Sequence, residues 1–209
     1  MVDLHYDPSS LCGPVDMHVV RFLEKYRGNN LDPSYLLHIS RWHGGIPGKQ
    51  YFDAEDGKTY RLGRLLTLVD EESELEPPFR PSWAFPNRDI RVDWSVLTLI
   101  DQEGPSCRHL FGGEELLPFA ALYWGTRHPD GMSLTDGNVN LLGFLYERKE
   151  QRPRVVVWLA LEAQQDYWRW EKALEACGWD KEEPVPYKDF TVPVAPNFDI
   201  FLTLLRAEP

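Results

Sequence analysis

The sequence predicts an α+β domain. Helix-type hydrophobic spacing lies near both ends of the 209-residue chain, and strand-type segments lie between them. Strands and helices do not alternate regularly, so a doubly wound parallel sheet is not expected. We therefore expect a single domain over residues 1–209, with a mostly antiparallel central sheet flanked by helices at both chain ends.

Two short helices are expected first. Val19, Phe22, Leu23 and Tyr26 recur at i, i+3, i+4 and i+7, which predicts one buried helical face that ends near Gly28. In the second helix Asp32 can cap the first turn and Pro33 suits its first position. The buried face of this second helix is predicted to contain Tyr35, Ile39 and Trp42.

The segment SRWHGGIPGKQYF, residues 40–52, is predicted to connect this helix to a strand. Gly44 can take a positive φ angle and Pro47 fixes a bend, with Trp42 buried at the base. A phosphate-binding loop would need strand before helix and Ser or Thr after the lysine, and neither condition is met. His38 and His43 are five residues apart, which favours surface or helix-end roles over a metal site.

Further along the chain, turn signals separate the expected strands. Glu55-Asp56-Gly57 predicts a hairpin turn, although DAEDGK (residues 53–58) partly mimics a calcium loop. Residues 77–91, rich in proline and arginine, indicate a long loop, and residues 93–103 fit either a helix or a strand. A helix is expected around residues 161–177, and Asn197 can cap a terminal helix whose apolar face must pack against the core.

The composition limits the classes of function. The formal net charge of -11 argues against binding a nucleic-acid backbone and fits a cytoplasmic protein or one with a basic partner. Three scattered cysteines predict neither a disulfide framework nor a zinc site. The chain begins without a signal-peptide pattern, and its longest apolar run is too short to span a bilayer. We expect no membrane segment, no metal and no cofactor.

Five segments in order resemble the SMI1/KNR4-like proteins of the SUKH superfamily. They are DPSYLLHISRWHGGIPGKQYF, RLGRLLTLVDEES, LLPFAA, GFLYERKE and VAPNFDIFLTLLR. Many members have Asn before the glycine pair, where this chain has His43. The residues that carry the resemblance are Pro33, Tyr35, Trp42, Gly44, Gly45, Pro47, Leu117, Pro118, Phe119, Phe198 and Phe201.

The resemblance covers roughly residues 15–205, with apparent insertions near 77–110 and 155–190. It implies an SMI1/KNR4-like α+β fold. Many bacterial members are regarded as immunity proteins that bind and neutralise toxins, often nucleases or deaminases, and fungal relatives regulate cell-wall synthesis. The family shares no catalytic residues, so the resemblance implies a non-enzymatic, protein-binding chain of the toxin–antitoxin kind.

Two features fit a partner-binding surface. Five acidic residues lie within seven positions and would attract a basic toxin domain over long range. They are Asp70, Glu71, Glu72, Glu74 and Glu76. Trp168 lies two positions from Trp170, so on a helix the two cannot face the same way, and Trp168 becomes a candidate contact residue. A solvated loop and a packed tryptophan are the simpler alternatives.

Two other classes of function stay open. Cys107, His109 and Glu114 lie close in sequence, and a cysteine–histidine pair can act as a nucleophile in a small hydrolase or transferase. The third class is an intracellular regulatory scaffold without a toxin partner. Our leading expectation is that no residue is catalytic and that the chain binds a protein.

Overall fold

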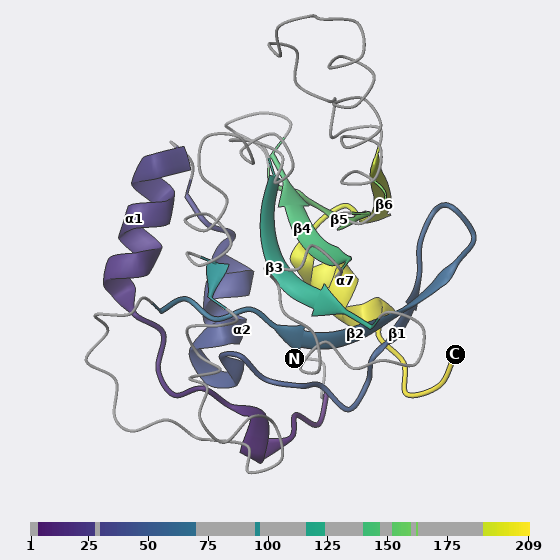
Figure 1. Ribbon diagram of the computed structural model, residues 1–209, viewed down its shortest axis with the longest axis horizontal. Coiled ribbons are helices and arrows are strands. Elements are labelled where there is room, and N and C mark those ends of the chain that lie inside the picture. Colours follow the sequence, from purple (N-terminus) through teal and green to yellow (C-terminus); the bar gives the residue numbers. More distant parts are fainter. Residues whose placement is uncertain are drawn as a thin grey trace, which may run out of the picture.

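The computed structural model describes residues 4–27, 30–69, 95–96, 116–123, 140–146, 152–159, 162 and 190–209. These ranges form an antiparallel sheet with three α-helices, so the predicted α+β class is confirmed (Figure 1). The elements are η1 (Pro8–Ser10), α1 (Met17–Arg27), α2 (Pro33–Trp42), β1 (Tyr51–Asp53), β2 (Thr59–Leu65), β3 (Leu116–Leu122), β4 (Leu141–Leu145), β5 (Arg154–Trp158), β6 (Thr191–Ala195) and α7 (Phe198–Leu204).

The sheet is a nearly closed meander. Its strands pair in chain order, from β1 to β6, and every pair is antiparallel. The two ends of the meander approach each other, because the Glu55 amide in the β1–β2 turn donates to the Pro193 carbonyl of β6 at 3.0 Å. After α7 the chain returns to β1, where Arg206 forms an antiparallel bridge with Tyr51. Short edge strands covered in this way leave little free backbone for another chain.

The predicted hairpin is confirmed. Gly57 has a φ angle of 76°, as a tight turn between β1 and β2 requires. The carboxylates of the calcium-like segment are engaged by the protein itself. Asp56 accepts from the Lys58 amide at 3.0 Å, and Asp53 pairs with Arg206 at 2.7 Å. The hairpin interpretation of this segment therefore holds.

Strand β3 lies between β2 and β4 and is buried along its whole length. Pro118 would normally disrupt a central strand, because it has no amide proton to donate. The register between β3 and β4 shifts between Pro118 and Ala120, so the proline coincides with an irregularity of the ladder. The LLPFAA segment thus contributes a strand to the centre of the sheet.

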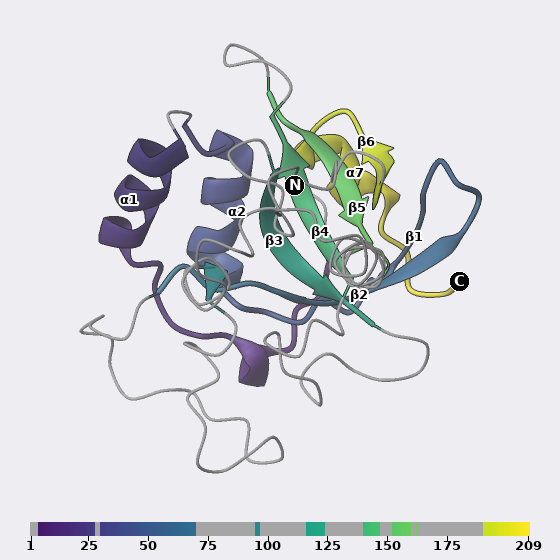
Figure 2. The same cartoon turned by 45° about the horizontal axis from the view of Figure 1, so that its top comes forward.

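Helices α2 and α7 pack on the same aromatic cluster. Phe119 of β3 and Phe144 of β4 stack at 4.4 Å, and Tyr35 of α2 contacts both rings. Phe198 and Phe201 of α7 meet Phe119 edge-on, at 5.6 and 5.9 Å. Edge-to-face pairs stabilise such clusters beyond simple area burial. In both views α1 and α2 lie side by side, and α7 lies against the sheet near β5 and β6 (Figures 1 and 2).

The connector after α2 has the predicted course and an unpredicted anchor. Gly44 has a φ angle of 68°, and a β-carbon there would lie 2.5 Å from the Cys12 sulfur. His43 is buried rather than superficial: its Nε2 accepts from the Leu68 amide at 2.7 Å, and its Nδ1 faces the Gly13 carbonyl at 3.1 Å. Of the two roles expected for His43, the surface role was wrong, because the ring is buried with both nitrogens in hydrogen-bond contact. The helix-end position is correct, since His43 is the C-cap residue of α2.

Two predictions about buried aromatic residues need correction. Trp42 is only half-buried, with one face stacked on Tyr6 at 5.0 Å. Phe22 of α1 is 49% exposed, and Val20 is buried beside Val19 instead. Helix α1 forms as predicted, but its buried face includes Val20 and excludes Phe22.

Several predicted segments fall outside the described residues, including the loop at 77–91 and, except for Glu162, the helix around residues 161–177. Of residues 93–103 the structure describes only Ser95 and Val96, where Ser95 forms a parallel bridge with Thr67. Residues 155–158, the start of the region assigned to a second insertion, belong to strand β5 within the sheet.

Candidate functional site

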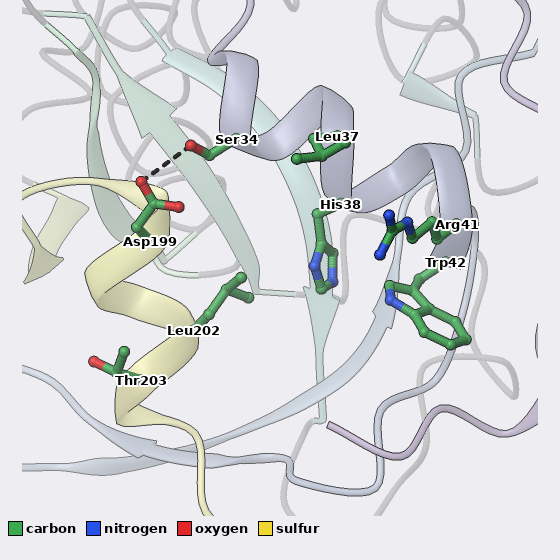
Figure 3. Close-up of a pocket in the computed structure, with 8 residues that line it drawn as sticks. All are labelled: Ser34, Leu37, His38, Arg41, Trp42, Asp199, Leu202 and Thr203. Carbon is green, nitrogen blue, oxygen red and sulfur yellow. Dashed lines mark hydrogen bonds between the residues drawn. The ribbon is translucent and has the colours of Figure 1, made fainter. Parts of the chain in front are cut away.

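A groove of about 360 Å³ lies between α2 and α7 (Figure 3). The α2 residues follow the spacing i, i+3, i+4 and i+7, which places them on one side of the helix. The residues that line the groove are Ser34, Leu37, His38, Arg41, Trp42, Asp199, Leu202 and Thr203.

Arg152 joins the two helices at one end of the groove. Its guanidinium makes a two-pronged contact with Asp32, through Nε at 3.0 Å and Nη2 at 3.1 Å. Its Nη1 reaches Asp199 at 2.9 Å, and Ser34 Oγ donates to the same Asp199 oxygen at 3.0 Å. Such forked contacts hold guanidinium and carboxylate in one orientation. Arg152 therefore fixes the spacing between α2 and α7 at this end.

The Asp32 carboxylate is fully buried and has a second role. It caps α2 by accepting from the Ser34 and Tyr35 amides at 2.8 and 3.2 Å. The hydrogen bond from Arg152 also lowers the pKa of Asp199 below its ordinary range. Asp199 is thus charged at neutral pH and already paired at the mouth of the groove.

Trp42 and His38 line the groove, and each contacts a ring that does not line it. Trp42 stacks on Tyr6 with an angle of 12° between the ring planes. The Tyr6 hydroxyl lies 2.7 Å from His38 Nε2, and the His38 ring meets Phe198 edge-on at 5.4 Å. In Figure 3 the His38 ring hangs from α2 into the space between Leu202 and Trp42. The His38 imidazole therefore faces a groove lined by both apolar and polar side chains.

Burial lowers the pKa of His38 to about 4, so the ring is neutral at physiological pH. This contradicts the surface role expected for His38, because the side chain is 92% removed from solvent and bonded to Tyr6. An imidazole with such a low pKa is a weak general base. It is better suited to forming one hydrogen bond than to moving protons.

One apolar side chain of the groove lining is open to solvent. Leu37 of α2 is 59% exposed. Ile200 and Leu204 of α7 are 43% and 39% exposed but do not line the groove, whose α7 residues are Asp199, Leu202 and Thr203. An exposed apolar side chain at a groove is available for contact with a partner.

The residues predicted to bind a partner lie outside the described residues. The same holds for the candidate nucleophile Cys107 and for His109 and Glu114. The unplaced partner-binding candidates are Asp70, Glu71, Glu72, Glu74, Glu76 and Trp168. Within the described ranges, no three acidic, histidine or cysteine side chains come close enough to hold a metal ion.

The residues that carry the family resemblance take structural positions. Pro33 begins α2, Tyr35 reaches the aromatic core, and Gly44, Gly45 and Pro47 form the buried connector. The remaining motif residues lie in buried positions of β3 and α7, and they are Leu117, Pro118, Phe119, Phe198 and Phe201. These residues build the scaffold on which the groove is carried.

The groove was not predicted from the sequence, and neither were the contacts of Arg152 with both helices. Arg152 lies 120 residues from Asp32 and 47 from Asp199, and a turn position gives no signal for such contacts. His38 could have been found from the helical spacing, since it lies three residues after Tyr35. Placing it at the second helix's buried edge would have required knowing that Tyr6 lies opposite.

A scan against protein-family models found no match to this chain, and searches of curated proteins and of solved structures found no significant match either. Among the described helices, none has the length and hydropathy that crossing a bilayer requires.

Proposed function

We propose that this chain is a non-enzymatic protein-binding domain of the SMI1/KNR4-like type. The observation that carries the proposal is the α2–α7 groove, whose lining residue Leu37 is 59% exposed. Leaving such a side chain exposed to water is unfavourable by roughly 1 kcal/mol or more. A partner that covers it recovers this free energy.

In the immunity form of the proposal, the partner is a basic toxin domain and the chain inhibits it by covering its active site. The net charge of -11 supports a basic partner, because opposite charges accelerate association. The acidic residues at positions 70–76 would add to this attraction. Their contribution should weaken as salt screens the charges.

The family resemblance supports the same proposal. Its motif residues fall in α2, the connector, β3 and α7, which are the elements that build and support the groove. A shared scaffold with an individual binding surface is how one fold serves different partners. In this proposal no cofactor is needed and the chain acts in the cytoplasm.

The test is co-expression of the tagged chain with products of neighbouring open reading frames, followed by capture at low and moderate salt. We expect one basic protein to be recovered, less of it at moderate salt, and cells to be protected from its toxicity. Leu37→Asp should reduce recovery strongly, as should combined charge reversal at Glu71, Glu72 and Glu74. Met17→Asp is the matched control, because Met17 is 54% exposed on α1 and does not line the groove.

Recovery that is unchanged by Leu37→Asp would remove the groove from the binding surface. If no neighbouring product is captured and none is toxic without this chain, the immunity form of the proposal is wrong.

A further inference from the structure

The His38 ring faces the α2–α7 groove beside Leu202 and Trp42. His38 is 92% buried, and within the part of the chain that the structure describes its ring forms one hydrogen bond, between Nε2 and the Tyr6 hydroxyl. The second ring nitrogen, Nδ1, has no partner among those residues. A polar atom left without a partner beside a groove is unfavourable unless water or a ligand satisfies it.

The hydrogen bond between Tyr6 and His38 Nε2 determines whether Nδ1 carries a proton. The Tyr6 hydroxyl carries one proton, and burial raises the pKa of Tyr6 far above its ordinary value, so the proton stays on the oxygen. Among the described residues His38 Nε2 is the hydroxyl's one acceptor, at 2.7 Å. If Tyr6 donates to Nε2, the neutral ring must carry its own proton on Nδ1. We therefore assign Nδ1–H as a hydrogen-bond donor.

Apolar and polar side chains line the groove around this donor. Leu37, Trp42 and Leu202 line the same groove, and its volume of about 360 Å³ lies within the range of small-ligand sites. Arg41 lines the groove as well, and Asp199 is already paired with Arg152. An N–H donor favours an oxygen acceptor on the ligand.

We propose that the α2–α7 groove binds an apolar side chain of a partner protein together with an adjacent peptide carbonyl, which accepts from His38 Nδ1–H. The side chain lies between Leu37, Trp42 and Leu202. The carbonyl replaces the water that would otherwise satisfy the imidazole. This inference rests on the proposed protein-binding function and names the chemistry that the groove recognises.

The test uses small probes with the full chain, labelled with ¹⁵N. N-acetyl-L-leucine N′-methylamide carries an isobutyl side chain between two peptide carbonyls, and the glycine analogue has the carbonyls alone. We expect the leucine probe to shift the amide signals of α2 and α7 saturably and to move the His38 Nδ1–H proton. The glycine probe should bind at least about tenfold more weakly, as burial of a full leucine side chain implies.

Two variants refine the test. Leu37→Ser should weaken the leucine probe about fivefold, since it removes part of the apolar wall. Met17→Ser, at a similarly exposed site on α1, should leave the affinity unchanged. His38→Phe keeps a ring of similar size and should abolish the preference for a carbonyl-bearing probe over 2-methylbutane-type hydrocarbons.

The inference is overturned if the leucine probe produces no saturable shifts at the groove, if the glycine probe binds as well, or if the ring proton lies on Nε2. These outcomes are separable from those of the capture experiment. A partner captured without any change in the α2 and α7 signals retains the proposed function and rejects the groove chemistry. If the leucine probe binds but no partner is captured, the groove chemistry is retained and the proposed function is rejected.

Discussion

His38 makes folding stability depend on pH. Its pKa is about 4 in the folded protein and about 6.5 in an unfolded chain, so the unfolded state binds more protons between these values. The stability that depends on neutral His38 is therefore fully present above pH 6.5, and it is lost as the pH drops toward 4. Between pH 7 and 5 we expect the free energy of unfolding to fall by about 2 kcal/mol from this residue. Urea unfolding at the two pH values measures the change.

His38→Gln is the control for this pH effect, since glutamine can bond to Tyr6 but does not titrate. The groups that face His38 are Tyr6, which stays neutral, and Arg41 and Asp199, which line the groove. Asp199 titrates below this window, because Arg152 lowers its pKa. A variant as sensitive to pH as the parent chain would show that other groups cause the loss.

Alanine substitutions at Gly44 and Gly57 distinguish the cost of backbone strain from the cost of a steric clash. Both have positive φ angles, of 68° and 76°. A β-carbon at Gly44 would lie 2.5 Å from the Cys12 sulfur, whereas one at Gly57 meets nothing within 4 Å. Gly57→Ala should therefore cost about 1–2 kcal/mol of backbone strain, and Gly44→Ala clearly more. Thermal unfolding of both variants measures this, and equal losses would mean that Cys12 moves away freely.

At the scale of elements, Arg152 is the contact that holds α2 against α7. Arg152→Ala leaves the buried Asp32 carboxylate with its two backbone donors but without a cation. Because Arg152 is 45% exposed, solvent reduces the loss, and we expect about 1–2 kcal/mol in urea unfolding. Hydrogen exchange should also increase in α2 and α7 more than in β4.

Arg206→Ala is the matched control for Arg152→Ala. It breaks the pair with Asp53, which has good geometry at an exposed position. Its effect on the urea midpoint should be clearly smaller, because exposed ion pairs contribute little. A larger effect from Arg206→Ala would show that the chain end, rather than the Arg152 contacts, holds the helices in place.

The elements that sequence predicted well are those fixed by local chemistry. Asp32 and Asn197 cap α2 and α7 as expected, and the hairpin at Gly57 follows from the turn residues. Burial depends on contacts distant in the chain and was predicted less well. His38 and His43 are buried because Tyr6, Gly13 and Leu68 supply their partners, and the pattern around each histidine contains none of these.

The candidate site follows the same division. Its α2 wall was present in the sequence as helical spacing, but the groove exists only because α7 packs alongside α2 from the far end of the chain. Arg152 could not be assigned to it, since no local rule links a turn before β5 to a helix cap 120 residues earlier. Contacts between residues so far apart in the chain can be identified only from the folded structure.

At the scale of the whole molecule, the C-terminal segment completes the structure. Helix α7 places Phe198 and Phe201 in the aromatic core, and Arg206 then pairs with Tyr51 at the first strand. Deleting residues 198–209 removes both rings and Leu205. Loss of a buried phenylalanine alone costs about 3–5 kcal/mol, and two such losses approach the 5–15 kcal/mol that stabilises a typical domain. We expect the shortened chain to show no cooperative thermal transition and to expose apolar surface.

Deleting residues 207–209 is the control for this truncation, because all three residues are exposed and lie beyond the bridge to Tyr51. Its melting temperature should stay within a few degrees of the full chain. Circular dichroism and calorimetry of the two truncations decide the matter. Cooperative unfolding of the chain that ends at residue 197 would mean that the sheet is stable without α7. The α2–α7 groove would then be an addition to a self-sufficient sheet, and its loss would abolish binding without unfolding the domain.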